Sequence, residues 1–379
     1  MKHLKPKILL IAHCYNNKAG VEEHLKVLAA SLNDSYQVSI AFPEQERLWL
    51  FQNNQPMFSL PTEAIPLLAP YNAPICRESL NKILAQVRPD LIHIVHFVNW
   101  PLSILEQLLA TKKPLIMSFH DYYLITPFWT MQGQDPRTTT TAEYAMKFFR
   151  SDISAYLQQR RALLLKILPM VNKLIVPSQY LRNQLQMIFP FEYEIIPYGI
   201  HPFEQKLATR DHSSLRFGYL GSLLPQKGWQ FLLQAYQQIA NQCTNSELHF
   251  YGGNADLSHN PERVRFHGVY EQSELPELLS NINIGIIPSV FAETYSIVLS
   301  EMWQAGIPAA VSDIGAMSDR VKDGINGKKF MPADVESLAD VLMWFYTNDS
   351  WRSWVIPKPV LADQMAAEYN RIYQDALRV

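Results

Sequence analysis

Short apolar runs alternate with segments of helical periodicity along the whole chain. The runs are rich in Val, Ile and Leu and end in turn residues, which is typical of strands buried on both faces of a parallel sheet. The segments between them have the mixed polarity of helices that cover such a sheet. In the first half of the chain, the predicted strands are residues 7–13, 37–42, 91–97, 114–120, 173–178 and 193–197. In the second half, they are residues 215–221, 247–252, 264–266, 284–289 and 309–312.

A polar stretch at residues 201–214 separates these two series of strands. The pattern therefore predicts an α/β fold with two Rossmann-like, doubly wound domains at residues 1–200 and 215–360, joined by that stretch as a linker. We expect the two domains to face each other across a cleft, with ligands bound outside the carboxyl ends of the strands. Residues 361–379 have the pattern of one amphipathic helix, which we expect to pack back on the first domain.

Composition narrows the class of protein. A length of 379 residues suits two domains, and 33 Lys and Arg against 35 Asp and Glu exclude the charge signature of a nucleic-acid-binding protein. The three cysteines are scattered, which fits a reducing cytoplasm and excludes a zinc cluster built from thiolates. Neither a signal peptide nor a continuous apolar span of membrane length is visible. We therefore expect a soluble, cytoplasmic protein, with peripheral contact at the inner face of the membrane left open.

Two glutamates follow the predicted strand 284–289. Glu293 stands where the strand ends, and Glu301 lies about two turns along a helix that we expect to begin at once. The N-terminus of a helix presents backbone N–H groups and a partial positive charge, which suit a phosphate. The two carboxylates could hold hydroxyl groups on either side of that phosphate, which is the layout that a sugar nucleotide needs. The alternative is a pair of solvated glutamates that flank a core helix.

Two further segments carry candidate chemistry at strand ends. In Gly221-Ser-Leu-Leu-Pro-Gln-Lys-Gly228, a glycine turn would bring the backbone close to a phosphate, and Lys227 would supply a cation. His120 lies at the carboxyl end of the strand 114–120, a better place for chemistry than a core position. Asp121 is expected to cap or orient the following loop. The alternatives are a surface turn with a solvated lysine and a structural histidine.

On these motifs the chain resembles the retaining glycosyltransferases of the GT-B fold in family 4, the glycosyl transferases group 1. The resemblance covers almost the full length, and the E-x7-E motif of that family matches Glu293 and Glu301. The segment 221–228 resembles the pattern G-R-x(4)-K-G, except that Ser222 replaces the arginine of many members. The segment 118–121 resembles T-x-H-D. The segment 16–24 resembles the turn G-G-x-E-x-H, with alanine in place of the first glycine.

The resemblance implies a role for each of these residues. Glu293 would contact hydroxyl groups of the donor sugar, Glu301 the ribose of the nucleotide, and the N–H groups of residues 294–297 the diphosphate. Lys227 would stabilise the leaving diphosphate, and His120 would lie beside the anomeric carbon. The implied catalytic residues are His120, Glu293 and Lys227. The implied donor-binding residues are Gly20, Gly221, Ser222, Lys227, Glu293, Thr294, Tyr295, Ser296, Ile297 and Glu301.

The implied reaction moves a sugar, expected to be a hexose, from a nucleotide diphosphate sugar to a glycan or lipid-linked acceptor. UDP is the nucleotide that we expect in the donor, and the family implies that the anomeric configuration is retained. We expect no cofactor and no metal, because no Asp-x-Asp pair stands in a suitable place. His93 and His96 look like a metal-binding pair, but on the predicted strand 91–97 they would point to opposite faces.

Other interpretations remain open at this point. One is an epimerase or phosphorylase with the same fold. Another is a non-catalytic nucleotide-sugar-binding subunit, which the replacements at Ser222 and Ala19 favour. The region 126–173 mixes aromatic and basic residues, and it could contact an acceptor glycan or anionic lipid headgroups. An ordinary helical layer with a solvated basic face explains that region as well.

Overall fold

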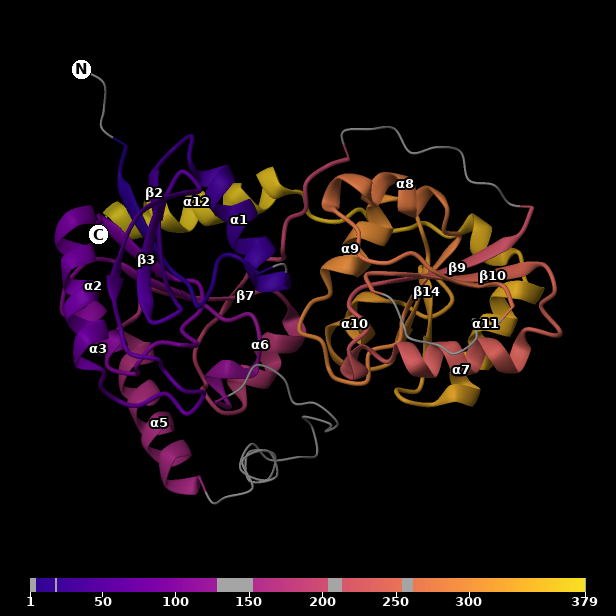
Figure 1. Cartoon of the computed structure of the whole chain (residues 1–379), viewed down its shortest axis with the longest axis horizontal. Coiled ribbons are helices and arrows are strands. Elements are labelled where there is room, and N and C mark those ends of the chain that lie inside the picture. Colours follow the sequence, from indigo (N-terminus) through magenta and orange to yellow (C-terminus); the bar gives the residue numbers. More distant parts are fainter. Residues whose placement is uncertain (1–4, 18, 128–152, 204–212, 254–261, 379) are drawn as a thin grey trace. The chain divides into compact units, whose positions relative to one another are not determined.

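The structure is a computed structural model that describes residues 5–17, 19–127, 153–203, 213–253 and 262–378 (Figure 1). It divides into two compact units. Among the described residues, the first unit runs to Gly199 and resumes at Leu361, and the second comprises those within Ile200–Val360. Most of the predicted linker and most of the aromatic and basic region 126–173 lie outside the described residues.

The first unit contains an 8-stranded sheet with the order β4-β3-β2-β1-β5-β6-β7-β8. All neighbouring strands from β2 to β8 are parallel. The parallel strands are β1 (Lys7–Ile11), β2 (Gln37–Glu44), β5 (Leu91–Ile94), β6 (Leu115–Ser118), β7 (Lys173–Val176) and β8 (Glu194–Ile195). Each overlaps a strand that the apolar pattern predicts.

An antiparallel hairpin at the edge of this sheet was not predicted. It consists of β3 (Arg47–Gln52) and β4 (Gln55–Pro61), which continue the sheet beyond β2. A two-residue turn at Gln45 and Glu46 joins β2 to β3, and another at Asn53 and Asn54 joins β3 to β4, with positive φ at all four residues. Such turns match the twist of a hairpin. The sheet is therefore mixed rather than wholly parallel.

Helices cover both faces of the first sheet. Ile92 and Ile94 of β5 belong to a core that also includes side chains from four helices: α2 (Pro74–Val87), α3 (Ile104–Leu109), α5 (Ser154–Ile167) and α6 (Gln179–Gln186). His93 points to the opposite face, because side chains alternate along a strand. There its ring contacts Tyr373 of the C-terminal helix α12 (Ala362–Arg378). Figure 1 shows α12, in yellow, beside α1 (Gly20–Leu32), with which it is in contact.

The second unit contains a 6-stranded parallel sheet with the order β11-β10-β9-β12-β13-β14. Its strands are β9 (Leu215–Leu220), β10 (Ser246–Tyr251), β11 (Val264–Phe266), β12 (Ile284–Ile287), β13 (Ala309–Ser312) and β14 (Gly327–Phe330). The edge strand β14 was not predicted. Helices α7 (Trp229–Ile239) and α11 (Val335–Thr347) pack on one face of the sheet. Helices α8 (Leu275–Ser280), α9 (Ile297–Gln304) and α10 (Gly315–Arg320) contribute to the core on the other face.

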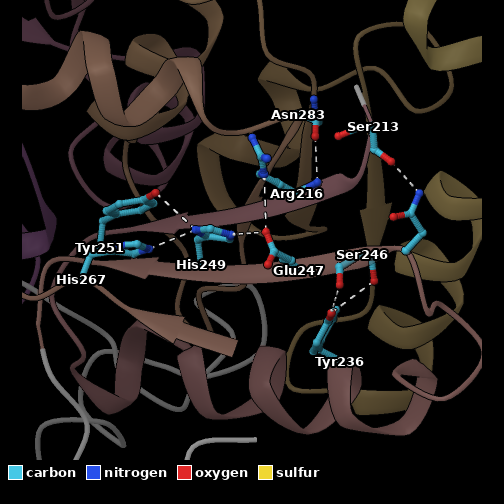
Figure 2. Close-up of polar contacts among 10 residues, drawn as sticks. Ser213, Arg216, Tyr236, Ser246, Glu247, His249, Tyr251, His267 and Asn283 are labelled. Atoms are coloured by element: carbon cyan, nitrogen blue, oxygen red, sulfur yellow. Dashed lines mark hydrogen bonds and ion pairs between the residues drawn. The ribbon is translucent and has the colours of Figure 1, made fainter. Parts of the chain in front are cut away.

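Polar side chains also line the second face of this sheet, along β10 (Figure 2). Glu247 and His249 share a face with Tyr251, because they are two residues apart on the strand. Arg216 of β9 lies opposite Glu247 and pairs with it at 3.5 Å. His249 Nδ1 lies 3.0 Å from Nε2 of His267. These contacts link β9 and β10 to the residue that directly follows β11.

The order of strands reverses direction once in each sheet. In the second unit the chain first builds outward from β9 through β10 to β11, and then from β12 through β13 to β14. The reversal therefore lies between β9 and β12. In the first unit the corresponding point lies between β1 and β5. Ligands of doubly wound sheets bind beside such points, at the carboxyl ends of the strands. Among the described residues, no helix has the length and apolar character needed to cross a membrane.

Candidate active site

Two loops meet at the reversal point of the second sheet. The first follows β9 and ends in a short 3₁₀ helix, Pro225–Lys227, and the second follows β12. The Gln226 carbonyl accepts a hydrogen bond of 3.0 Å from the N–H group of Val290. Gly228 has φ +70°, and a Cβ atom there would lie 1.8 Å from the Pro288 oxygen. Only glycine therefore lets the two loops pack backbone against backbone.

The ammonium group of Lys227 and the carboxylate of Glu293 form an ion pair across these loops. Lys227 Nζ lies 2.9 Å from Glu293 Oε1, and the two side chains are 33% and 8% exposed. The Ser289 hydroxyl donates a hydrogen bond to the same carboxylate oxygen. The Lys227 ammonium also lies 5.3 Å from the centre of the Phe291 ring. The structure thus brings together two residues that the sequence motifs predicted from segments 66 residues apart.

The Glu293 carboxyl group remains ionised although it is buried. Burial by itself raises the pKa of Glu293, but the Lys227 charge and hydrogen bonds from Ser289, Lys227 and Ser296 outweigh it and lower the pKa below 4.5. At neutral pH this carboxylate can accept hydrogen bonds from hydroxyl groups. Lys227 in turn presents a cation that is partly open to solvent.

The helix after Glu293 begins later than predicted. Helix α9 starts at Ile297, and Ser296 is its N-cap residue with φ 70° and ψ 95°. Thr294 and Tyr295 therefore belong to the loop and not to the helix. Glu301 consequently lies one turn into α9, where two turns were expected. The left-handed conformation of Ser296 explains the shift, since the backbone cannot enter the helix before it.

Glu301 is buried on α9, one turn after the start of the helix. Its Oε1 accepts a hydrogen bond of 3.1 Å from Gln272 Nε2. The pKa of the neighbouring Tyr270 is raised, first by burial and then by the Glu301 charge. Glu301 is thus placed among polar groups that follow β11, and not beside Lys227 in the ion pair described above.

Gly221 and Ser222 form the turn directly after β9. Gly221 has φ +136°. A Cβ atom on Gly252, at the end of β10, would lie 2.3 Å from the Gly221 oxygen, so the backbones of the two strand ends touch. The Ser222 side chain is exposed, and its carbonyl accepts a hydrogen bond of 2.6 Å from the Tyr219 hydroxyl. Glycine at position 252 therefore lets the ends of β9 and β10 pack backbone against backbone.

Helix α10 holds the loop that contains Glu293 from behind, and sequence reasoning missed this contact. The Ala316 N–H group donates to the Glu293 oxygen at 2.8 Å. Arg320 donates to the oxygens of Tyr295 and Ser296, each at 2.8 Å. Gly315 could have signalled the close packing, because a glycine between a strand and a helix often marks a close approach. No sequence motif that we recognised points to Arg320.

In the first unit, His120 follows β6 and is buried. Its Nδ1 atom lies 2.8 Å from the Tyr198 hydroxyl, and its ring centre lies 4.8 Å from that of His24. Burial and, to a lesser degree, the nearby His24 hold the pKa of His120 well below its usual range, so the ring is neutral at pH 7. Gly20 is exposed at the first residue of α1. These two residues belong to the first unit, whereas the other predicted site residues belong to the second.

Asp121 caps the loop after His120, as predicted. It accepts a hydrogen bond from the Tyr123 N–H group at 2.8 Å and pairs with His96 at 3.0 Å. The prediction that His96 lies on a strand was wrong, since β5 ends at Ile94. His93 instead contacts Tyr373 and Ser118, so the two histidines have different partners. Across the described ranges, no group of three or more His, Cys, Asp or Glu residues is arranged to hold a metal ion.

Two family models match this chain. The model for Glycosyltransferase Family 4 matches residues 19–202, and the model for Glycosyl transferases group 1 matches residues 214–348. Over 372 residues, the chain is 20% identical to a phosphatidyl-myo-inositol mannosyltransferase of Mycolicibacterium smegmatis, covering 92% of this chain and 87% of that protein. Over 145 residues, it is 28% identical to the O-antigen chain mannosyltransferase B of Escherichia coli, covering 35% of this chain and 37% of that protein.

Solved structures share the fold over nearly the full length. The pneumococcal O-GlcNAc transferase GtfA in complex with UDP and GlcNAc aligns with a TM-score of 0.67 at 10% identity, and the alignment covers 100% of both chains. Anabaena Alr3699/HepE in complex with UDP and glucose aligns with a TM-score of 0.63 at 14% identity, over 98% of this chain and 100% of that chain. The predicted GT-B fold class is confirmed. The chain is a glycosyltransferase, and it belongs to the glycosyl transferases group 1 and family 4.

Proposed function

We propose that this glycosyltransferase moves a hexose from a nucleotide diphosphate sugar, with UDP as the expected nucleotide, to a glycan or lipid-linked acceptor. The anomeric configuration is retained, and the reaction needs no metal. The observation that carries the proposal is the Lys227–Glu293 ion pair, 2.9 Å apart at the reversal point of the second sheet. In a hexose linked to a diphosphate, the leaving phosphate and the ring hydroxyls are only a few bonds apart. A cation for the first and a carboxylate for the second must therefore be neighbours.

The residues divide the chemical work as follows. The bond between the anomeric carbon and the diphosphate oxygen breaks as the acceptor oxygen bonds to the same carbon. The acceptor proton passes to the departing phosphate. Lys227 and the backbone N–H groups of residues 294–297 stabilise the charge that develops on that phosphate. Glu293 accepts hydrogen bonds from the sugar hydroxyls and does not act as a nucleophile. Glu301 binds the ribose, and the neutral His120 ring supports the region of the anomeric carbon.

The comparisons support particular parts of this proposal. A relative that spans most of the chain is named as a phosphatidyl-myo-inositol mannosyltransferase, which supports a hexose donor and a lipid acceptor. The structural neighbours in complex with UDP and a sugar support a UDP-sugar donor. An acceptor embedded in a membrane would bring the protein to the cytoplasmic face of that membrane. A free glycan acceptor would not require this contact.

A donor panel tests the proposal. Nucleotide release from UDP-, GDP- and ADP-sugars is measured with and without EDTA, first alone and then with mixed glycan and lipid acceptors. We expect release from one donor, unaffected by EDTA and at least about 100-fold slower in Glu293→Ala. The matched control is Glu277→Ala, which removes an exposed glutamate of the same unit. For the donor that is used, the anomeric configuration of the product is read by NMR.

Several results would contradict the proposal. Nucleotide binding without release in the presence of acceptors would indicate a nucleotide-sugar-binding subunit. Turnover that requires only inorganic phosphate would indicate a phosphorylase. An inverted product, or loss of activity with EDTA, would reject the stereochemistry or the metal independence and leave the transfer itself in place.

A further inference from the structure

Both ends of helix α10 contact the loop 293–297. At its start, the Ala316 N–H group donates to the Glu293 carbonyl at 2.8 Å. Gly315 permits this approach, because a Cβ atom there would lie 2.6 Å from the same oxygen. At its end, Arg320 donates to the carbonyls of Tyr295 and Ser296. Three carbonyls of one short loop therefore face a single helix.

The guanidinium of Arg320 is fixed from several sides. Besides the two carbonyls, it donates to the Ser300 hydroxyl at 2.7 Å. It also lies 4.2 Å from the centre of the Tyr295 ring and 4.9 Å from that of the Trp303 ring. Its planar fork suits this combination of paired donors and aromatic faces, which an ammonium group cannot reproduce. Arg320 thus holds a positive charge directly against the peptide groups that precede α9.

The orientation of these carbonyls determines the orientation of the neighbouring N–H groups. In a trans peptide, the C=O and N–H bonds point in opposite directions. The described chain contains no cis peptide bond. Carbonyls that face α10 at residues 293, 295 and 296 therefore turn the N–H groups of Thr294, Ser296 and Ile297 away from it. A cation bound to the carbonyl also polarises the peptide and strengthens its N–H group as a donor.

Ser296 needs such support, because its φ of 70° is a conformation that residues other than glycine rarely adopt. We propose that Arg320 is a positioning residue for the donor. By binding the carbonyls of Tyr295 and Ser296, it turns the N–H groups of Ser296 and Ile297 toward the diphosphate. The inference rests on the proposed function, in which these N–H groups meet the diphosphate. It also assigns a second positive centre to a site in which Ser222 provides none. The charge of Arg320 acts through two peptide groups and not by direct contact.

Binding of a nucleoside diphosphate and of the matching nucleoside separates this role from a structural one. Calorimetric titrations of the wild type first measure its affinity for UDP and uridine, ADP and adenosine, and GDP and guanosine. The variants are then tested with the pair whose diphosphate binds the wild type most tightly. We expect Arg320→Met to weaken diphosphate binding about tenfold or more and to leave nucleoside binding within about twofold. Arg320→Lys keeps the charge but not the planar guanidinium, so its diphosphate affinity should lie between those of the wild type and Arg320→Met. Melting temperatures verify that each variant is folded.

The matched control is Arg263→Met. Arg263 also donates to backbone carbonyls of the second unit, those of Thr244 at 2.7 Å and Ala240 at 2.5 Å, but it does not contact the loop 293–297. We expect this variant to lower the melting temperature without changing the ratio of the two affinities. In Arg320→Ala, added methylguanidinium should restore part of the diphosphate affinity, which a variant that only misfolds would not show.

Two results would overturn the inference in different ways. If Arg320→Met binds the diphosphate as tightly as the wild type, or loses nucleoside and diphosphate binding equally, Arg320 does not position the diphosphate donors, while the proposed function stands. If the wild type binds none of the nucleoside diphosphates, the proposed function fails and the inference fails with it.

Discussion

At the scale of single residues, the Lys227 charge is the largest of the effects that keep the buried Glu293 carboxylate ionised. Removing one partner of such a pair leaves the other without compensation, which costs more than removing both. We expect Lys227→Met to lower the free energy of unfolding by about 2 kcal/mol. Adding Glu293→Gln to that variant should recover most of the loss.

Urea denaturation of the two single variants, the double variant and the wild type measures this coupling as a double-mutant cycle. The recovery concerns stability alone, because the double variant still lacks the groups proposed for catalysis. Additive losses, with no recovery in the double variant, would mean that the two side chains do not stabilise each other in the folded protein.

Some site residues could be predicted from the sequence and others could not. Glu293 and Lys227 each lie in a loop that follows a strand, β12 and β9, and the motif of each is contained in the residues around it. Arg320 lies at the end of a helix and acts on a loop 24 residues earlier in the chain. Its role depends on how α10 packs on that loop, and local periodicity contains no information on such a contact.

At the scale of elements, glycine lets the two loops of the site approach each other. Gly228→Ala combines a strained φ of +70° with a Cβ atom 1.8 Å from the Pro288 oxygen. Gly306→Ala is the matched control, because it has a similar φ of +68° with no atom within 4 Å. We expect the control to cost about 1 kcal/mol of stability and Gly228→Ala at least about 1 kcal/mol more.

Activity provides the second measurement of the same pair of variants. Gly228→Ala should displace the loop that bears Lys227 and lower turnover of the donor, whereas Gly306→Ala should leave turnover within about twofold. Equal effects of the two alanines on stability and turnover would show that the contact with Pro288 is not needed.

Each element that could not be predicted from the sequence lacks a local signal for a physical reason. The turn at Gln45 and Glu46 has positive φ at both residues but no glycine or asparagine, so it gives no hairpin signal. The second turn, at Asn53 and Asn54, did carry a usable signal. Strand β14 has lysines at its two central positions, so it lacks the apolar run that marked the other parallel strands. The helix start at Ile297 could not be predicted, because contacts from α10 hold Ser296 in its conformation.

At the scale of the whole molecule, the apolar pattern was enough for the fold class, because parallel strands buried on both faces are the most apolar segments of the chain. The core of the first unit also contains buried histidines, and burial keeps them uncharged at neutral pH. It lowers the pKa of His24 to about 3, and burial with a smaller effect of His24 lowers that of His93 to about 3. Their ordinary pKa is 6.5.

These shifts predict how stability depends on pH. The unfolded chain binds protons at these histidines below pH 6.5, whereas the folded chain does not until about pH 3. Their contribution to stability is therefore complete above pH 6.5 and is lost as the pH falls toward 3, by about 1.4 kcal/mol per pH unit for each histidine. In urea denaturation at several pH values, His24→Phe should reduce the slope by that amount. The exposed His201→Asn is the control, and an unchanged slope in His24→Phe would contradict the assignment.

The central claim is that Lys227 stabilises the leaving diphosphate of a transferred sugar. The most direct measurement compares kcat for donor turnover with the Kd of the nucleoside diphosphate product in Lys227→Met. The matched control is Lys328→Met, since Lys328 also pairs with a carboxylate, Asp323 at 3.0 Å, and lies 5.0 Å from the Trp344 ring. We predict that kcat falls about 100-fold or more in Lys227→Met, that Kd rises by no more than about tenfold, and that the control changes neither. A kcat that stays within a few-fold of the wild type in Lys227→Met would contradict the claim.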